Sequence, residues 1–150
     1  MGFSLAAPPR SMIATRFPAQ GTLVLFSGPP GGPLGALVEV DALSGSDALS
    51  LRDALRTAAA VRIGNPRVVG DPEQVTFGEA QRSAVPMLAG NGAARTLYCV
   101  VMVPATERTP QGLLVWLYIS GHGVDAPGCA PVLAHPSLAP IASGFRIEAP

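Results

Sequence analysis

Lysine is absent from this chain of 150 residues, and all ten of its basic residues are arginine. Charged residues make up only 13% of the sequence, and their signs cancel to a net charge of zero. Nucleic-acid binding depends mainly on neutralising phosphates, so a neutral chain without a basic cluster is a poor candidate for it. The low charge also leaves little repulsion between neighbouring molecules, which favours a protein partner or a homodimer.

Long apolar runs are missing as well. No run approaches the roughly 18 residues that a membrane-spanning helix needs, so we predict no membrane span. The N-terminal sequence MGFSLAAPPR has neither the charged start nor the apolar stretch of a signal peptide. These absences predict a cytoplasmic protein by default. A leader or lipoprotein anchor already removed from the chain would make it secreted or membrane-anchored instead.

Cysteine is scarce, and the two cysteines allow one disulfide at most. Cys99 lies inside an apolar run, and Cys129 lies later, in a segment rich in proline and glycine. Because an unpaired cysteine behaves as a small hydrophobic residue, we expect two free, buried thiols.

Signatures of catalysis are also lacking. There is no G-x-S-x-G turn to present a serine nucleophile, and no evident pair of carboxylates. His122, Asp125, Cys129 and His135 are of metal-binding types, but their spacing matches no common structural zinc pattern. We therefore predict no metal, no cofactor and no enzyme. The alternative left open is a small-ligand protein, or a thiol- and histidine-dependent enzyme that uses the region of Cys129 and His135.

What the sequence does contain is a pair of strand-like runs, Arg95–Val103 and Gly112–Ser120, rich in β-branched and aromatic residues. Both runs are apolar at odd and at even positions, so both faces of the strands must be covered. The segment Gly78–Leu88 precedes them and predicts a third strand, with Pro86 marking an edge or a bulge. A turn at Ala89–Gly92 completes an antiparallel meander.

Two other parts of the chain have helical features. Ala48–Arg62 has apolar residues at helical spacing and predicts a helix on one face of the meander. Near the C-terminus we expect a turn at Pro131–His135 and a short helix over Ser137–Ser143, with Gly144 just beyond its end. Thr22–Ser27, Leu34–Val40 and Gln74–Phe77 are further strand candidates. The pattern predicts one α+β domain spanning residues 1–150, an antiparallel β-sheet flanked by helices as an α/β/α sandwich.

The order of these pieces resembles a known superfamily. The chain presents GFSL, ALVEV, the helix LRDALRTAAAVR, then QRSAVPML, RTLYCVVMV and GLLVWLYIS, and it closes on IASGFRI, with Ser143, Phe145 and Arg146 as a small, aromatic, basic sequence. This is similar to the PsbP-like superfamily, which includes photosystem II extrinsic subunits, a Ran-binding nuclear import factor and bacterial lipoproteins and secretion chaperones. The resemblance implies a module that binds other proteins.

These observations predict a non-enzymatic protein-binding module: an adaptor, chaperone or assembly factor of bacterial origin. The C-terminal segment is interrupted by prolines, which suggests that it covers the sheet poorly. We therefore predict an apolar groove on the sheet face opposite Ala48–Arg62, near Tyr98, Trp116 and Tyr118 or their neighbours on the other face. Loops Gly28–Gly35 and Pro104–Gln111, at the strand ends, are further binding candidates.

Overall fold

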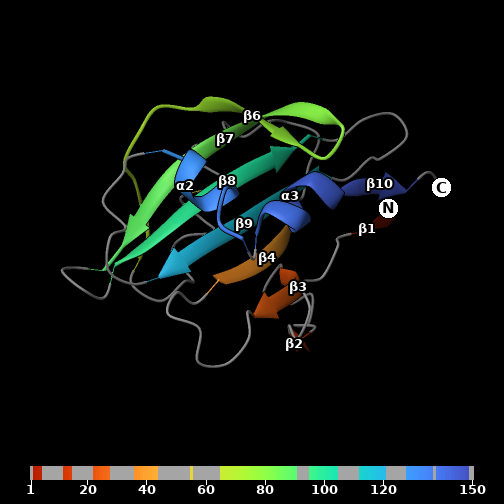
Figure 1. The fold of residues 1–150 in the computed structure, drawn as a ribbon, viewed down its shortest axis with the longest axis horizontal. Helices are drawn as coiled ribbons and strands as arrows, with labels where there is room; N and C mark the ends of the chain where they lie inside the picture. The colour runs from red at the N-terminus through yellow and green to blue at the C-terminus, as the bar shows by residue number, and fades with distance from the viewer. Residues whose placement is uncertain are drawn as a thin grey trace.

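The architecture is an antiparallel sheet with two short helices packed on one face (Figure 1). This computed structural model describes residues 2–4, 12–14, 22–27, 36–43, 55, 65–90, 95–104, 112–120, 128–136 and 138–148. The elements are β1 (Gly2–Ser4), β2 (Met12–Ala14), β3 (Thr22–Ser27), β4 (Ala36–Leu43), β5 (Arg67–Val68), β6 (Glu73–Phe77), β7 (Ala80–Ala89), β8 (Thr96–Val103), β9 (Gly112–Ser120), α2 (Ala130–Leu133), α3 (Ala139–Gly144) and β10 (Arg146–Glu148).

Within the described part of the chain, eight strands form one sheet in the order β2-β3-β4-β9-β8-β7-β5, and β6 also pairs with β7. Every pairing is antiparallel. A separate two-stranded sheet joins β1 to β10, which brings the two ends of the chain together (Figure 1). The predicted α+β class and the meander of β7, β8 and β9 are confirmed.

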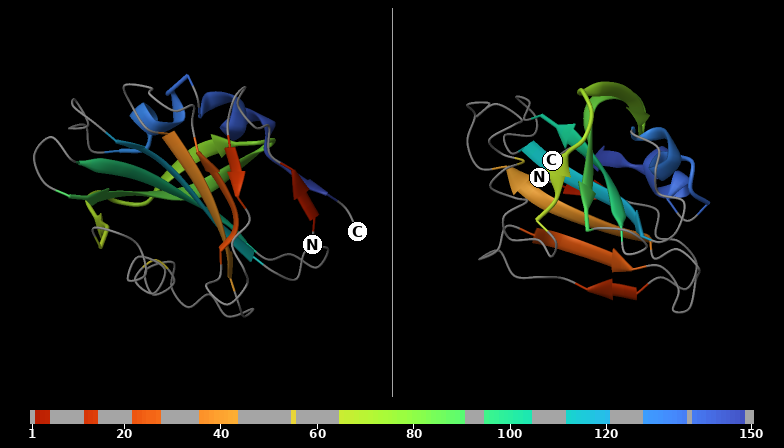
Figure 2. Two further views of the ribbon diagram at one scale, coloured as in Figure 1. Left: turned by 90° about the horizontal axis from the view of Figure 1, so that it is seen from below. Right: turned by 90° about the vertical axis from the view of Figure 1, so that its left-hand side faces the viewer.

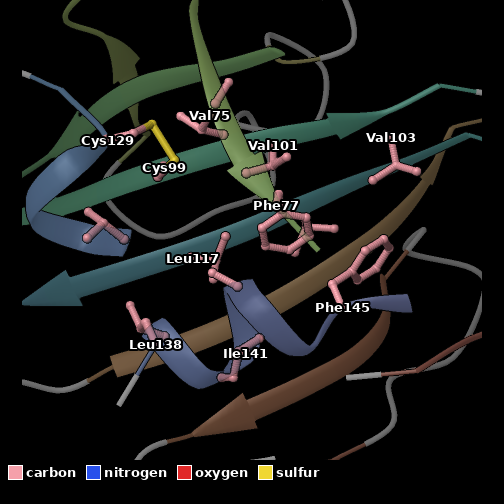
Figure 3. Packing of buried hydrophobic residues seen from close by; sticks show 14 of the residues in the cluster. Val75, Phe77, Cys99, Val101, Val103, Leu117, Cys129, Leu138, Ile141 and Phe145 are labelled. Carbon is pink, nitrogen blue, oxygen red and sulfur yellow. A yellow bond between two sulfur atoms is a disulfide. The ribbon is translucent and has the colours of Figure 1, made fainter. Parts of the chain in front are cut away.

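The central strands β8 and β9 are covered on both faces, as their two apolar sets require. On one face they pack against α2 and α3, which lie along one side of the sheet in Figure 2 and contribute to the cluster in Figure 3. We call this face the C-terminal face. Its buried residues in β8 and β9 are Leu97, Cys99, Val101, Val103, Leu113, Val115, Leu117 and Ile119.

The other face carries a second cluster, and we call it the aromatic face. It contains Tyr98 and Val100 from β8 and Leu114 and Trp116 from β9. Leu55, which is helical and 2% exposed, packs into the same cluster. Leu55 belongs to the segment predicted as a helix over residues 48–62, and the rest of that segment lies outside the described residues.

The prolines of the C-terminal segment begin helices where the sequence pattern predicted interruptions. Pro131 and Pro140 each occupy the first turn of a helix, α2 and α3. A proline there costs little, because the first turn has no intrahelical acceptor for its missing N–H. Residues 130–133 are therefore helical, where a turn was expected. Gly144 is the last residue of α3, and it is not among the described glycines with positive φ, so it is not a left-handed terminator.

Pro86 lies in an interior strand, which corrects the expectation of an edge. Strand β7 pairs with β8 on one side and with β5 and β6 on the other. The chain leaves the ladder between β5 and β6, opposite Val85 and Pro86, and returns at Glu73. The carbonyl of Pro86 accepts a hydrogen bond from the N–H of Val69 at 3.1 Å. The proline therefore sits where its partner strand is interrupted, so the ladder loses little.

The connection between β7 and β8 is longer than the tight hairpin that Ala89–Gly92 predicted. The last pair of the ladder joins Ala89 to Thr96, and Gly90 leaves the strand with a φ of 81°. Asn91 and Gly92 lie outside the described residues, as do the loop Gly28–Gly35 and residues 105–111 of the other candidate loop.

Candidate functional site

The three aromatic residues predicted to bind a partner are neighbours on the aromatic face. Tyr98 of β8 lies opposite Tyr118 of β9, and their ring centroids are 4.7 Å apart. Trp116 lies diagonally across from Tyr98 and meets it edge-on, with centroids 5.6 Å apart and ring planes at 89°. Edge-to-face geometry is favourable because the positive ring edge meets the negative face. The register of β8 and β9 thus brings the three rings together.

Burial divides this trio into two roles. Trp116 is fully buried and Tyr98 is 6% exposed, so both are core residues. Tyr118 is half-buried and packs at the edge of the same cluster. Of the three, Tyr118 is therefore the side chain that keeps exposed surface, whereas Tyr98 and Trp116 are packed in the core beside it.

The groove predicted opposite the Ala48–Arg62 segment is not present in the described structure. That face is the C-terminal face. Leu138, Ile141 and Phe145 fill it (Figure 3), and Val132 is buried in the same cluster. The prediction failed because Pro131 and Pro140 start helices, so the segment covers the sheet after all. Among the described residues, Val68 is the exposed large hydrophobic side chain, at 48%.

Cys99 and Cys129 form a disulfide, which corrects the expectation of two free thiols. Cys99 lies on β8 facing the C-terminal helices, and Cys129 stands at the start of α2 (Figure 3). Their Cα atoms are 4.9 Å apart, within the range that a disulfide spans. Both residues are fully buried. The hydrophobic surroundings were predicted, but the pairing follows from the docking of α2 on β8.

The candidate thiol and histidine chemistry is not assembled in this structure. The sulfur of Cys129 is bonded to Cys99, so it is not a thiolate nucleophile or a metal ligand. His135 is half-buried just after α2. Within the part of the chain that the structure describes, no three His, Cys, Asp or Glu residues are grouped to hold a metal ion. His122 and Asp125 lie outside that part.

A carboxylate on β6 holds the start of α2. Oε1 of Glu73 accepts a hydrogen bond from the backbone N–H of Cys129 at 2.8 Å. This N–H belongs to the residue that caps α2, where no intrahelical acceptor exists. The bond joins residues far apart in sequence, and it fixes the same end of the segment that the disulfide fixes.

The small, aromatic, basic sequence near the C-terminus makes packing, hydrogen-bond and ion-pair contacts within the chain. Phe145 is buried against Phe77 of β6, with ring centroids 4.8 Å apart. Arg146 donates from Nη1 to the carbonyl oxygens of Ser143, at 2.9 Å, and of Phe145, at 2.8 Å. Its Nε lies 3.1 Å from Oε1 of Glu79. These contacts are internal, so they support a structural role for Phe145 and Arg146.

The turn of the hairpin formed by β6 and β7 packs against the end of α3 and Phe145. The N–H of Gly78 donates to the carbonyl of Ala142 at 2.6 Å. Gly78 has a φ of 68°, and a Cβ built there would collide with the carbonyl oxygen of Phe145. Glycine is needed at this position for both reasons. The sequence pattern predicted Gly78 as the first residue of a strand over Gly78–Leu88, whereas it lies in the turn between β6 and β7.

Arg82 of β7 adds a further contact between the β6–β7 hairpin and Phe145. Its Nε donates to the carbonyl of Phe77 at 3.3 Å, and its guanidinium lies over the ring of Phe145, 5.7 Å from the centroid. Partial burial lowers the pKa of Arg82 below its ordinary value, because desolvation penalises the charged form. The arginine thus packs as part of the core edge.

In the described portion of the chain, no helix has the length and apolar character that crossing a membrane requires.

Comparison with known proteins gives a fold likeness. No protein-family model matches this sequence, and no curated protein is significantly similar to it. Among solved structures, the fold is similar to LpqN of Mycobacterium tuberculosis, described as involved in cell envelope biogenesis. The TM-score is 0.52 at 13% identity, and the match covers 99% of this chain and 83% of that chain. Over nearly its whole length, the chain therefore shares the fold of a mycobacterial protein involved in cell envelope biogenesis.

Proposed function

We propose that this chain is a non-enzymatic protein-binding module of the bacterial cell envelope, serving as an adaptor, chaperone or assembly factor. The observation that carries the proposal is the full-length fold likeness to LpqN. Since a fold can serve many functions, the likeness supports a setting more than an activity. We also propose membership of the PsbP-like superfamily, which the order of sequence elements suggested.

The disulfide supports a location outside the cytoplasm. Disulfides persist in oxidising compartments such as the periplasm and the cell exterior, and they are rare in the reducing cytosol. The Cys99–Cys129 bond thus favours the secreted or lipoprotein alternative over the cytoplasmic default. This agrees with an envelope role, and it rests on a feature independent of the LpqN likeness.

We propose that Tyr118 contacts the partner, a different protein or a second copy of the chain, and that Tyr98 and Trp116 hold it in place. The support is the contact of Tyr118 with Tyr98 and its half-buried position at the end of the cluster. A tyrosine suits this role because it combines a large apolar ring with a hydrogen-bonding hydroxyl and loses little side-chain entropy on binding.

Site-specific photo-cross-linking in the native host tests this proposal. A photoreactive phenylalanine analogue replaces Tyr118 in one variant and Thr76, exposed on β6, in a matched control. We expect a discrete adduct from position 118, from an envelope protein or from the chain itself, that position 76 does not give. Equal or absent adducts at the two positions would remove Tyr118 from the interface.

The enzymatic alternative predicts a different result. The native protein should react with a thiol reagent at a low-pKa cysteine and should turn over an ester, phosphate or peptide substrate. The binding module predicts no thiol reaction, because Cys99 and Cys129 are joined and buried. Turnover abolished by Cys129→Ala would overturn our proposal.

A further inference from the structure

The C-terminal segment, meaning the described residues between Gly128 and Glu148, is held on the sheet at two separate places. Its helices are short, four residues in α2 and six in α3, and in neither does the side chain of the N-cap residue itself cap the helix with a hydrogen bond. Helices of this length do not persist alone in water, so the segment depends on what attaches it. The two attachments differ in chemistry.

At the α2 end the attachment is mainly covalent. The disulfide ties Cys129 to β8, and Glu73 accepts the hydrogen bond from the N–H of the same residue. Val132, in α2, adds a fully buried apolar side chain. Half of α2 faces outward, because Ala130 and Pro131 are exposed. Leu133 of α2 also packs, partly buried, against the cluster. Without the disulfide, one turn of helix would be retained by the apolar contacts of Val132 and Leu133 and the hydrogen bond to Glu73.

At the α3 end the attachment is noncovalent and more extensive. Leu138, Ile141, Ala142 and Phe145 are buried in the cluster of the C-terminal face. The hairpin contact between Gly78 and Ala142 and the pairing of β10 with β1 add backbone hydrogen bonds. This end therefore contributes four buried apolar residues to that cluster, and we expect these to keep it docked without the disulfide.

We infer that the Cys99–Cys129 disulfide is a redox-controlled restraint on the α2 end alone. Reduction by a dithiol transfers two electrons and two protons to the sulfur atoms of Cys99 and Cys129, and the dithiol leaves as a cyclic disulfide. The reduced chain then opens locally at α2 and uncovers the apolar surface of β8 and β9 around Cys99, while α3 and Phe145 stay docked. This inference does not rest on the proposed binding function.

Hydrogen exchange distinguishes the two ends. The N–H groups of Leu133 and Ala134 bond to Cys129 and Ala130 within α2, whereas those of Gly78 and Ala142 report on the α3 end. In Cys99→Ala/Cys129→Ala we expect exchange at Leu133 and Ala134 to rise about 100-fold or more, as loss of a loop-closing cross-link implies. Gly78 and Ala142 should change less than about threefold under native conditions, since they exchange through local opening of the α3 end, which does not open the loop between Cys99 and Cys129, and not through global unfolding.

A matched control separates the cross-link from packing. Val132→Ala removes the buried apolar contact of α2 but keeps the disulfide, so Leu133 and Ala134 should exchange much more slowly than in the double cysteine variant. Faster exchange at both ends of the double variant, or at neither, would overturn the inference.

A measurement on the wild-type chain covers the case in which the double variant does not fold. The rate of reduction by dithiothreitol is measured against denaturant concentration at low denaturant. Local opening at α2 exposes little surface, so we expect a nearly flat dependence. A dependence as steep as that of global unfolding would show that the disulfide is reached only by unfolding the whole domain, and would overturn the inference.

Discussion

At the scale of single residues, burial separates core positions from surface positions within one aromatic cluster. Trp116 and Tyr118 lie on the same strand and face, yet Trp116 is fully buried and Tyr118 is half-buried. Alternation along β9 predicted the shared face from the sequence. It could not predict the difference in burial, because that depends on what covers each position, and Leu55 arrives from a distant segment.

We predict that Trp116→Ala destabilises the protein by about 3–5 kcal/mol, because a buried ring is replaced by a cavity. Chemical denaturation measures the change in the free energy of unfolding. Val68→Ala is the control, and as a surface change it should stay within about 0.5 kcal/mol of wild type. A loss below roughly 1 kcal/mol for Trp116→Ala would mean that the ring is not part of the core.

The second prediction at this scale concerns Gly78, in the turn between β6 and β7. Gly78→Ala places a Cβ at positive φ and against the carbonyl of Phe145, so we expect a loss of at least about 1–3 kcal/mol from backbone strain alone. Gly144→Ala is the matched control. Gly144 ends α3 without positive φ, and alanine favours helices, so that variant should be neutral or slightly stabilised. Equal losses for the two glycines would contradict the prediction.

At the scale of elements, the hairpin of β6 and β7 and the α3 end of the C-terminal segment form one packing unit. An ion pair, a stacked arginine and a pair of phenylalanine rings all contribute contacts there. Their contributions to the free energy of unfolding differ greatly. The side chains of Arg146 and Glu79 are 46% and 76% exposed, and exposed ion pairs contribute about 0–1 kcal/mol. Burial of the Phe145 ring therefore stabilises this packing unit more than the ion pair does.

Thermal unfolding checks this ranking. Phe145→Ala should lower the stability by about 3–5 kcal/mol, whereas Glu79→Gln should cost less than about 1 kcal/mol and lose its effect in high salt. Comparable losses from the two variants would show that the ion pair, and not the ring, positions α3.

At the scale of the whole molecule, the disulfide is a further contribution to stability. A cross-link that closes a loop of this length stabilises by about 3–4 kcal/mol in the chain-entropy description. For a domain of this size we expect reduction to lower the Tm by roughly 10 °C. Dithiothreitol should leave the Tm of Cys99→Ala/Cys129→Ala unchanged. An unchanged Tm on complete reduction of wild type would show that the disulfide adds no stability.

The sequence alone determined the α+β class, the meander and the two faces of its central strands, because strand propensity and the alternating direction of side chains along a strand are local properties. It also located most strands, with small shifts such as Ala36–Leu43 for β4. The candidate aromatics Tyr98, Trp116 and Tyr118 could be assigned to one face in the same way. Whether they bind a partner stays a prediction.

Only the tertiary structure decided what covers each face and whether the two cysteines form a disulfide. Cys99 and Cys129 meet because α2 packs on β8, and Pro131 and Pro140 support helices because they occupy first turns. Both outcomes depend on contacts between segments distant in sequence, where local propensity carries no information. For the same reason the predicted groove was lost: the helices begun by Pro131 and Pro140 bury the face that local patterns left open.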